Sequence, residues 1–272
     1  MRKVILHYHF FKNAGTTVER ILENTFGEGW GAIDGNNPSG HVSPEELLGF
    51  VQSHPDLHAV SSHQALMPPP ETEGLEMVPL LLLRHPIDRA RSVYSFESKQ
   101  AAGTPGAEFA ANHSFPEYVR WRLDNRVNGV IHNFQITWLL RRPWRMRPLL
   151  HKHTYREVMT LLDSLPCFGM VERFRKSMQL FNRVHQDGFE LEGINIAPQN
   201  VTRERRTTLQ ERLGMIREEL GDKLMDELRE RNAYDLAMYR DAMILFEKRC
   251  EQWLDEAPGA EPARAGGQGG GR

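Results

Sequence analysis

Residues 3–9 read KVILHYH, residues 10–17 read FFKNAGTT and residues 18–26 read VERILENTF. The first run predicts a β-strand, and the third has apolar residues at the spacing of an amphipathic helix. The short loop between them would direct backbone N–H groups and a helix N-terminus at one point, which is how many proteins bind anions. The stretch therefore predicts a strand, a tight loop and a helix. A phosphate site in the loop and a glycine serving only backbone geometry are equal alternatives.

Three side chains of this loop suit a phosphate ligand, because Lys12 supplies a cation and Thr16 and Thr17 supply hydroxyl groups. A Walker A loop requires two glycines around four residues, followed by Lys and Ser or Thr. Here Lys12 precedes Gly15, the only glycine of the loop. The Mg²⁺ arrangement of an NTPase is therefore missing from the pattern. A ligand with phosphates, but without metal-assisted transfer of a γ-phosphoryl group, fits better.

The composition is that of an ordinary soluble globular protein: 272 residues, 40% hydrophobic, 26% charged, with a net charge of −2. The simplest interpretation is one α/β domain over residues 1–257, followed by a disordered tail over 258–272 that is rich in Gly, Ala and Pro. The near-neutral charge disfavours bulk binding to nucleic acid or to an anionic membrane. It leaves a local basic site possible.

The sequence also indicates the cellular compartment of the protein. No run approaches the roughly 20 apolar residues of a membrane span, and polar residues interrupt the first apolar stretch where a secretory signal would continue. The two cysteines, Cys167 and Cys250, are too few for a disulfide framework. We therefore expect a cytoplasmic protein with no membrane span and no nucleic-acid partner, and the pattern leaves its oligomeric state open.

Four segments have the composition of strands: 4–9, 58–62, 78–83 and 167–171. The third is almost continuously aliphatic, as in a strand covered on both faces of a parallel sheet. Helix-capping patterns begin at Ser43 and at Thr154. Strands separated by helices predict an α/β fold with a doubly wound parallel sheet.

Three stretches rich in Gly or Pro are predicted to be long loops, of the kind that often forms binding edges: 27–40, 67–74 and 101–114. Beyond about residue 203 the chain becomes charged, with apolar residues at helical spacing. This pattern predicts a helical C-terminal part of two or three helices packed on the sheet domain. Four tryptophans, Trp30, Trp121, Trp138 and Trp144, fit either the core or an acceptor cleft, because spacing alone does not decide between them.

A second constellation, RHPIDRARS at residues 84–92, follows the aliphatic strand. Arg84 would lie at the carboxyl end of that strand, where open α/β sheets bind ligands, in the same layer as Lys12. Pro86 would begin a helix that carries Ser92 about two turns after Arg84. A guanidinium group and a hydroxyl group suit a phosphate. An ion pair of Arg84 with Asp88 is an equally good structural alternative.

Together the two segments resemble sulfotransferases that use 3′-phosphoadenosine 5′-phosphosulfate (PAPS), and more narrowly carbohydrate O-sulfotransferases such as the heparan sulfate 2-O and 6-O enzymes and their bacterial relatives. The first loop of that family reads approximately His-Ile-Pro-Lys-Thr-Gly/Ala-Gly-Thr-Ser. Residues 9–17 match it, except that Phe11 replaces Pro and Asn13 replaces Thr. The family's second motif is Arg-x-Pro-x-x-Arg with a later Ser, which is matched here by Arg84, Pro86, Arg89 and Ser92. Weaker similarities cover residues 133–137, 171–174 and 232–239.

The resemblance implies a P-loop NTPase-like parallel sheet flanked by helices, and transfer of a sulfuryl group from PAPS to a hydroxyl, on a sugar or glycan. It implies no metal and no redox cofactor. The 5′-phosphosulfate would lie on the first loop, held by Lys12, Asn13, Ala14, Gly15, Thr16 and Thr17. The 3′-phosphate would lie on Arg84 and Ser92. The basic residues 203–206 are predicted either to close over the nucleotide or to begin a charged helix.

Sulfuryl transfer also needs a general base, and histidine is the usual choice near neutral pH. His63 follows the strand 58–62, at the position where the similar enzymes carry their histidine base, so His63 and Lys12 are the predicted catalytic residues. His7 and His9 have the i, i+2 spacing of some metal ligands, but no matching cluster is evident in the sequence. Two alternatives stay open: a nucleotide-dependent kinase on a related fold, and a non-catalytic nucleotide-binding protein.

Overall fold

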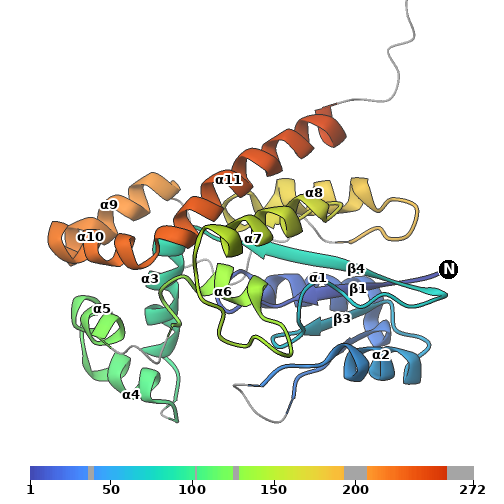
Figure 1. Ribbon diagram of the computed structural model, residues 1–272, viewed down its shortest axis with the longest axis horizontal. Coiled ribbons are helices and arrows are strands. Elements are labelled where there is room, and N and C mark those ends of the chain that lie inside the picture. The colour runs from blue at the N-terminus through green and yellow to red at the C-terminus, as the bar shows by residue number, and fades with distance from the viewer. Residues whose placement is uncertain (36–39, 102, 125–128, 193–206, 256–272) are drawn as a thin grey trace, which may run out of the picture.

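The computed structural model describes residues 1–272 except 36–39, 102, 125–128, 193–206 and 256–272. Five strands form one parallel sheet in the order β2-β3-β1-β4-β5 (Figure 1). Their bounds are β1 Arg2–Tyr8, β2 Trp30–Ala32, β3 Ala59–Ser62, β4 Leu75–Leu83 and β5 Gly169–Met170. The predicted α/β class and parallel sheet are confirmed. The last strand is shorter than predicted, and β4 begins earlier.

The register of the sheet decides where a site can form. β1 lies between β3 and β4, so that Tyr8 is opposite Ser62 on one side and Leu81 on the other. Because all three strands are parallel, their carboxyl ends meet at the same edge of the sheet. The loops that follow β1, β3 and β4 therefore open side by side.

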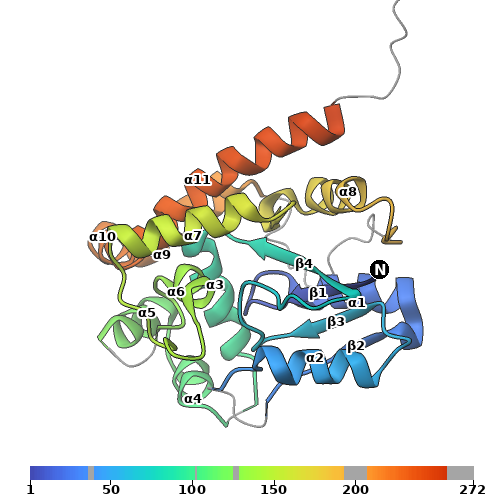
Figure 2. The same ribbon diagram turned by 45° about the vertical axis from the view of Figure 1, so that its right-hand side comes forward.

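Eleven α-helices are described: α1 Gly15–Phe26, α2 Pro44–Ser53, α3 Pro86–Glu97, α4 Pro105–Asn112, α5 Phe115–Asp124, α6 Phe134–Leu140, α7 Lys152–Ser164, α8 Phe174–Val184, α9 Leu209–Leu220, α10 Asp222–Arg231 and α11 Ala233–Cys250. Helices α7, α8 and α11 gather at the β5 end of the sheet, and α2 lies at the end formed by β2 and β3 (Figure 2). Within the described ranges, none of these helices is both long and apolar enough to cross a membrane.

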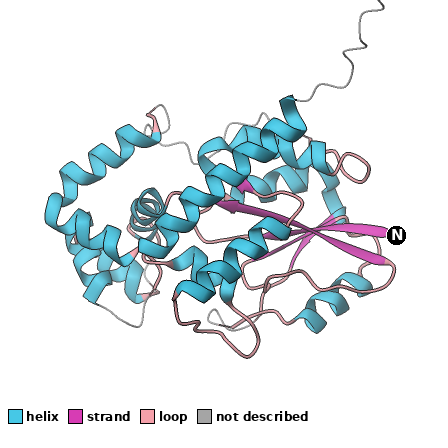
Figure 3. Ribbon diagram, turned by 45° about the horizontal axis from the view of Figure 1, so that its top comes forward, coloured by secondary structure: helices cyan, strands magenta, loops and turns pink. Residues whose placement is uncertain are grey.

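Two apolar cores hold these elements together. The larger surrounds the sheet and includes Leu6 and, from α11, Phe246, both fully buried. The smaller joins α3, α4, α5, α9 and α10 through side chains such as Val119 and Leu228. The strands accordingly lie toward one end of the molecule and a group of helices toward the other (Figure 3). Two or three helices were expected after about residue 203, and α9, α10 and α11 are described there. α11 packs against the core around the sheet, and α9 and α10 pack on α3 and α5.

Three local predictions were wrong. Residues 27–40 include a 3₁₀ turn and β2, and residues 101–114 include α4, because proline is favourable at the first position of a helix. The capping pattern at Thr154 is displaced: α7 begins at Lys152, and His151 is its N-cap. The capping box of Ser43 with Glu46 is present as predicted. The predicted tail, 258–272, lies outside the described residues.

Candidate functional site

The loop after β1 is built to present N–H groups. Lys12 and Ala14 have φ angles of 63° and 64°, in the left-handed region that non-glycine residues rarely adopt. Each such residue costs about 1–3 kcal/mol, and such strain is concentrated at functional sites. In the described part of the chain, the backbone N–H groups of Ala14, Gly15 and Thr16 donate to no other group, and they lie at the N-terminus of α1. This combination of N–H groups without an acceptor and a helix dipole suits an anion.

Gly15 is required here by a close approach rather than by its backbone angles. A Cβ atom at this position would lie 1.9 Å from Cδ2 and 2.1 Å from Nε2 of His9. The imidazole of His9 therefore lies directly against the first residue of α1. The sequence alone did not distinguish this reason for the glycine from a turn requirement.

Substitution of Gly15 by alanine is expected to lower both the melting temperature and the affinity for anionic ligands. The added methyl group must displace His9, and overpacking of this kind costs about 1–3 kcal/mol. Gly49 provides the matched control, because it lies in α2 with no atom near its missing Cβ. Gly49→Ala should instead raise stability by about 0.5–1 kcal/mol. Thermal unfolding of both variants tests this, and equal stability of Gly15→Ala and wild type would contradict it.

Asn13 supports the loop through its side chain. Its amide donates to the carbonyl oxygen of Leu82, at 2.8 Å, and to Oε1 of Gln135, at 2.7 Å. The same Oε1 atom accepts from the backbone N–H of Arg84 at 2.9 Å, and Nε2 of Gln135 donates to the carbonyl oxygen of Arg84 at 2.8 Å. One buried glutamine thus connects the loop after β1 to the loop after β4.

Two buried carboxyl groups brace this connection. Asp235, on α11, accepts from the N–H groups of Gln135 and Ile136, at 3.0 and 2.7 Å. Glu172 accepts from the N–H of His85 at 2.8 Å. Burial raises the pKa of both carboxyl groups. Segment 133–137 thus contacts both loops through Gln135, and segment 171–174 contacts the loop after β4 through Glu172. Segment 232–239 braces Gln135 through Asp235.

Arg84 forms an ion pair with Asp88, which the sequence allowed as an alternative to a phosphate contact. Its guanidinium contacts Asp88 through Nη2 and Nε, at 2.7 and 2.8 Å, and donates from Nη1 to the carbonyl oxygen of Lys12 at 2.9 Å. Arg212, on α9, binds the other oxygen of Asp88 at 2.7 Å. Burial alone would raise the pKa of Asp88, but the two arginines hold it below its ordinary value. Ser92 is half-buried on α3. The basic residues 203–206 lie outside the described part of the chain.

Lys12 is positioned by an aromatic ring that no local sequence pattern indicates. Its Nζ atom lies 4.4 Å from the centre of the Phe96 ring, near the C-terminal end of α3. The ring of Phe11 contacts Phe96 edge-on, with 5.5 Å between the centroids. Phe11, which lies where the sulfotransferase motif has proline, thus helps to place Phe96 beneath Lys12.

His63 is oriented by Asp34. Nδ1 of His63 lies 2.8 Å from Oδ2 of Asp34, while the backbone N–H of His63 and the hydroxyl of Ser62 donate to Oδ1, at 2.8 and 3.2 Å. An ionised carboxylate can only accept, so Nδ1 is the donor in this hydrogen bond, and in the neutral form of the imidazole Nε2 then carries the lone pair. The His63 side chain is 49% exposed. It can therefore accept a proton from a group in solution.

A second imidazole–carboxylate pair lies directly against the first. The rings of His63 and His9 are stacked, with 3.9 Å between the centroids and 26° between the planes. His9 in turn pairs with Glu19, on α1, through Nδ1 at 2.8 Å. His9 also lies against Gly15, so it contacts both His63 and the loop that presents the N–H groups.

His7, His9 and Glu19 are the group in the described ranges whose ligand atoms could meet at a metal, since these atoms lie within 4.8 Å of one another. The i, i+2 spacing in the sequence indicates both histidines but not Glu19, which lies on α1. His7 pairs with the Ser61 hydroxyl at 3.0 Å, and burial lowers its pKa well below the usual value, which keeps the ring neutral. All three side chains already have polar partners, because His7 contacts the Ser61 hydroxyl and His9 contacts Glu19.

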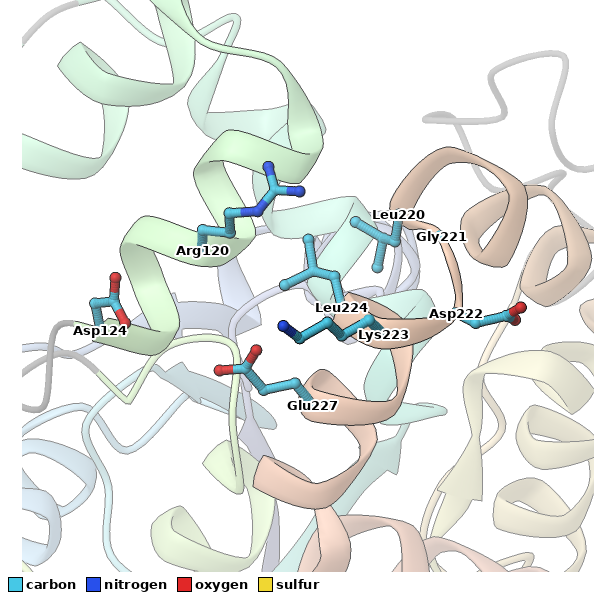
Figure 4. A pocket seen from close by; sticks show the side chains of 8 residues that line it. All are labelled: Arg120, Asp124, Leu220, Gly221, Asp222, Lys223, Leu224 and Glu227. Carbon is cyan, nitrogen blue, oxygen red and sulfur yellow. The ribbon is translucent and has the colours of Figure 1, made fainter.

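A hollow of about 500 Å³ lies elsewhere, among α5, α10 and the end of α9 (Figure 4). Lys223 and Glu227 line it from α10, facing Arg120 on α5. Its charges have mixed signs, and it shares no residue with the loops after β1, β3 and β4. We therefore place the candidate site at the carboxyl edge of the sheet and not in this hollow.

Comparison with known proteins finds a similar protein, but its name states no activity. The chain is 29% identical over 256 residues to an uncharacterized protein of Archaeoglobus fulgidus, across 91% of this chain and 98% of that protein. No family model matches the chain. The function must therefore be argued from the residues of the site.

Proposed function

We propose that this protein is a PAPS-dependent sulfotransferase that acts on a hydroxyl group of a sugar or glycan. The observation that carries the proposal is the His63–Asp34 pair, stacked on His9 beside the loop that begins at Lys12. An oriented imidazole next to an anion-binding loop is what the transfer of an anionic group to a hydroxyl requires. The motifs shared with known PAPS-dependent enzymes supply the identity of the transferred group.

In this proposal each residue has a defined part in an in-line displacement at sulfur. Nε2 of His63 accepts the proton of the acceptor hydroxyl while its oxygen forms the new bond to sulfur. The bond between sulfur and the 5′-phosphate oxygen breaks, and adenosine 3′,5′-bisphosphate leaves. Lys12 and the free N–H groups of Ala14, Gly15 and Thr16 stabilise the charge that develops on the departing phosphate oxygen.

The proposal assigns the 3′-phosphate to Arg84 and Ser92. Arg84 already holds the loop through the carbonyl oxygen of Lys12, so a nucleotide bound there would connect both ends of the site. Arg212, which shares Asp88 with Arg84, adds a second guanidinium to the same place. A nucleotide without a 3′-phosphate would lose these contacts, and a charge-assisted hydrogen bond contributes about 1.5–3 kcal/mol.

Calorimetric titration tests this assignment directly. Wild-type protein is expected to bind adenosine 3′,5′-bisphosphate at least about tenfold more tightly than ADP, because only the first ligand carries a 3′-phosphate. Ser92→Ala and Arg84→Lys should reduce this preference, whereas Arg240→Ala, at an exposed arginine on α11, should not. Equal or tighter binding of ADP by the wild type would argue for a kinase-like protein and against the proposal.

A further inference from the structure

The segment between α6 and the second turn of α7 is rich in positively charged residues. Residues 141–156 read RRPWRMRPLLHKHTYR, with five arginines, one lysine and no acidic residue, in a chain whose net charge is −2. We refer to residues 141–156 as the basic segment. Such a concentration of positive charge creates a local field that the total charge conceals.

A tight turn in the basic segment is firmly held. The N–H of Arg145 donates to the carbonyl oxygen of Arg142 at 2.9 Å, and the reverse hydrogen bond is 3.3 Å long. Both guanidinium groups pair with Glu157, on α7. Arg141, next to the turn, donates to the carbonyl oxygen of Gly40 at 2.7 Å. These contacts fix the turn and leave Pro143 and Trp144 at its tip.

Trp144 projects from this turn with 82% of its surface exposed, and Leu149, farther along the segment, is 81% exposed. The other four tryptophans are at least partly buried: Trp30, Trp121, Trp138 and Trp253. Isolated exposed apolar residues are common, but here two bulky side chains lie five residues apart on a segment with exposed cations. The exposed cations are Arg147, Lys152 and Arg156.

We propose that the basic segment docks the protein on an anionic lipid bilayer. Trp144 and Leu149 would enter the interfacial region, and the neighbouring cations would meet lipid phosphates. A soluble polyanion such as nucleic acid would engage the cations but would leave Leu149 in water. A bilayer interface accommodates both kinds of side chain, and docking of this kind needs no membrane-spanning helix.

Co-sedimentation with vesicles tests the inference independently of any enzymatic activity. We expect the full chain to bind vesicles of phosphatidylcholine mixed with phosphatidylglycerol, and to bind pure phosphatidylcholine at least tenfold more weakly. The double substitution Trp144→Ala, Leu149→Ala should weaken binding to the mixed vesicles at least tenfold. Arg147→Glu combined with Lys152→Glu should do the same. Both pairs are exposed, so the fold should be preserved, as circular dichroism would verify.

Ile244→Ala is the matched control, because Ile244 is an exposed apolar residue (66%) on α11, outside the basic segment. Its binding to vesicles should equal that of the wild type. Failure of the wild type to bind the mixed vesicles would overturn the inference. So would binding that Ile244→Ala weakens as much as the double substitution does. Tighter binding to single-stranded DNA or heparin than to vesicles would overturn it too, and would identify the partner as a soluble polyanion.

Discussion

Replacing His63 with alanine is expected to slow sulfuryl transfer by about 10²–10⁴-fold, the usual contribution of a positioned general base. Binding of adenosine 3′,5′-bisphosphate should be unchanged, because the proposed nucleotide contacts come from other residues. Single-turnover transfer assays together with calorimetry separate the two quantities. His54→Ala, at an exposed histidine after α2, is the control and should retain full activity. Joint loss of nucleotide binding and folding in His63→Ala would mean that the residue is structural.

Asp34→Asn refines this test. The amide can donate to Nδ1 as well as accept from it, so the imidazole is free to adopt the tautomer with its proton on Nε2. Transfer should then fall, but less than in His63→Ala, with the nucleotide affinity retained. If Asp34→Asn were fully active, the contact with His63 at 2.8 Å would have no part in orienting the base.

Replacing Lys12 with alanine is expected to lower the rate of transfer by about 10²–10³-fold, as the loss of one charge-stabilising donor does in other enzymes. The effect should be larger on the rate than on nucleotide binding, because charge on the leaving oxygen grows as the bond to sulfur breaks. Lys99→Ala is the control, at an exposed lysine just after α3. An unchanged rate in Lys12→Ala would refute the role given to this residue.

Phe96 offers a way to test the position of the Lys12 charge without removing it. Phe96→Leu keeps an apolar side chain beneath Lys12 but removes the aromatic ring. A cation–π contact at a partly exposed site contributes about 0.5–1 kcal/mol, so a decrease in transfer of roughly two- to fivefold is expected. A decrease as large as that of Lys12→Ala would indicate instead that Phe96 shapes the loop.

The parts of the site predicted from the sequence are those that local patterns encode. The loops after β1 and β4 each follow an apolar strand and precede a helix, so the sequence pattern alone places Lys12 and Arg84 at one edge of the sheet. Asp34 could not be predicted, because it is 29 residues from His63 and lies in a Gly-rich stretch without periodicity. Phe96 was missed for a similar reason: only the packing of α3 brings it to Lys12. Partners that depend on tertiary packing leave no signal in local spacing.

The link through Gln135 has a consequence for how a ligand binds. Because one buried amide holds both Asn13 and Arg84, the two loops keep a fixed separation before any nucleotide arrives. Ordering these two loops on binding then costs little conformational entropy, and the ligand must fit two loops at a fixed separation. A shortened ligand that reaches only one loop therefore gains nothing from the other, and two such fragments should bind additively, without cooperativity.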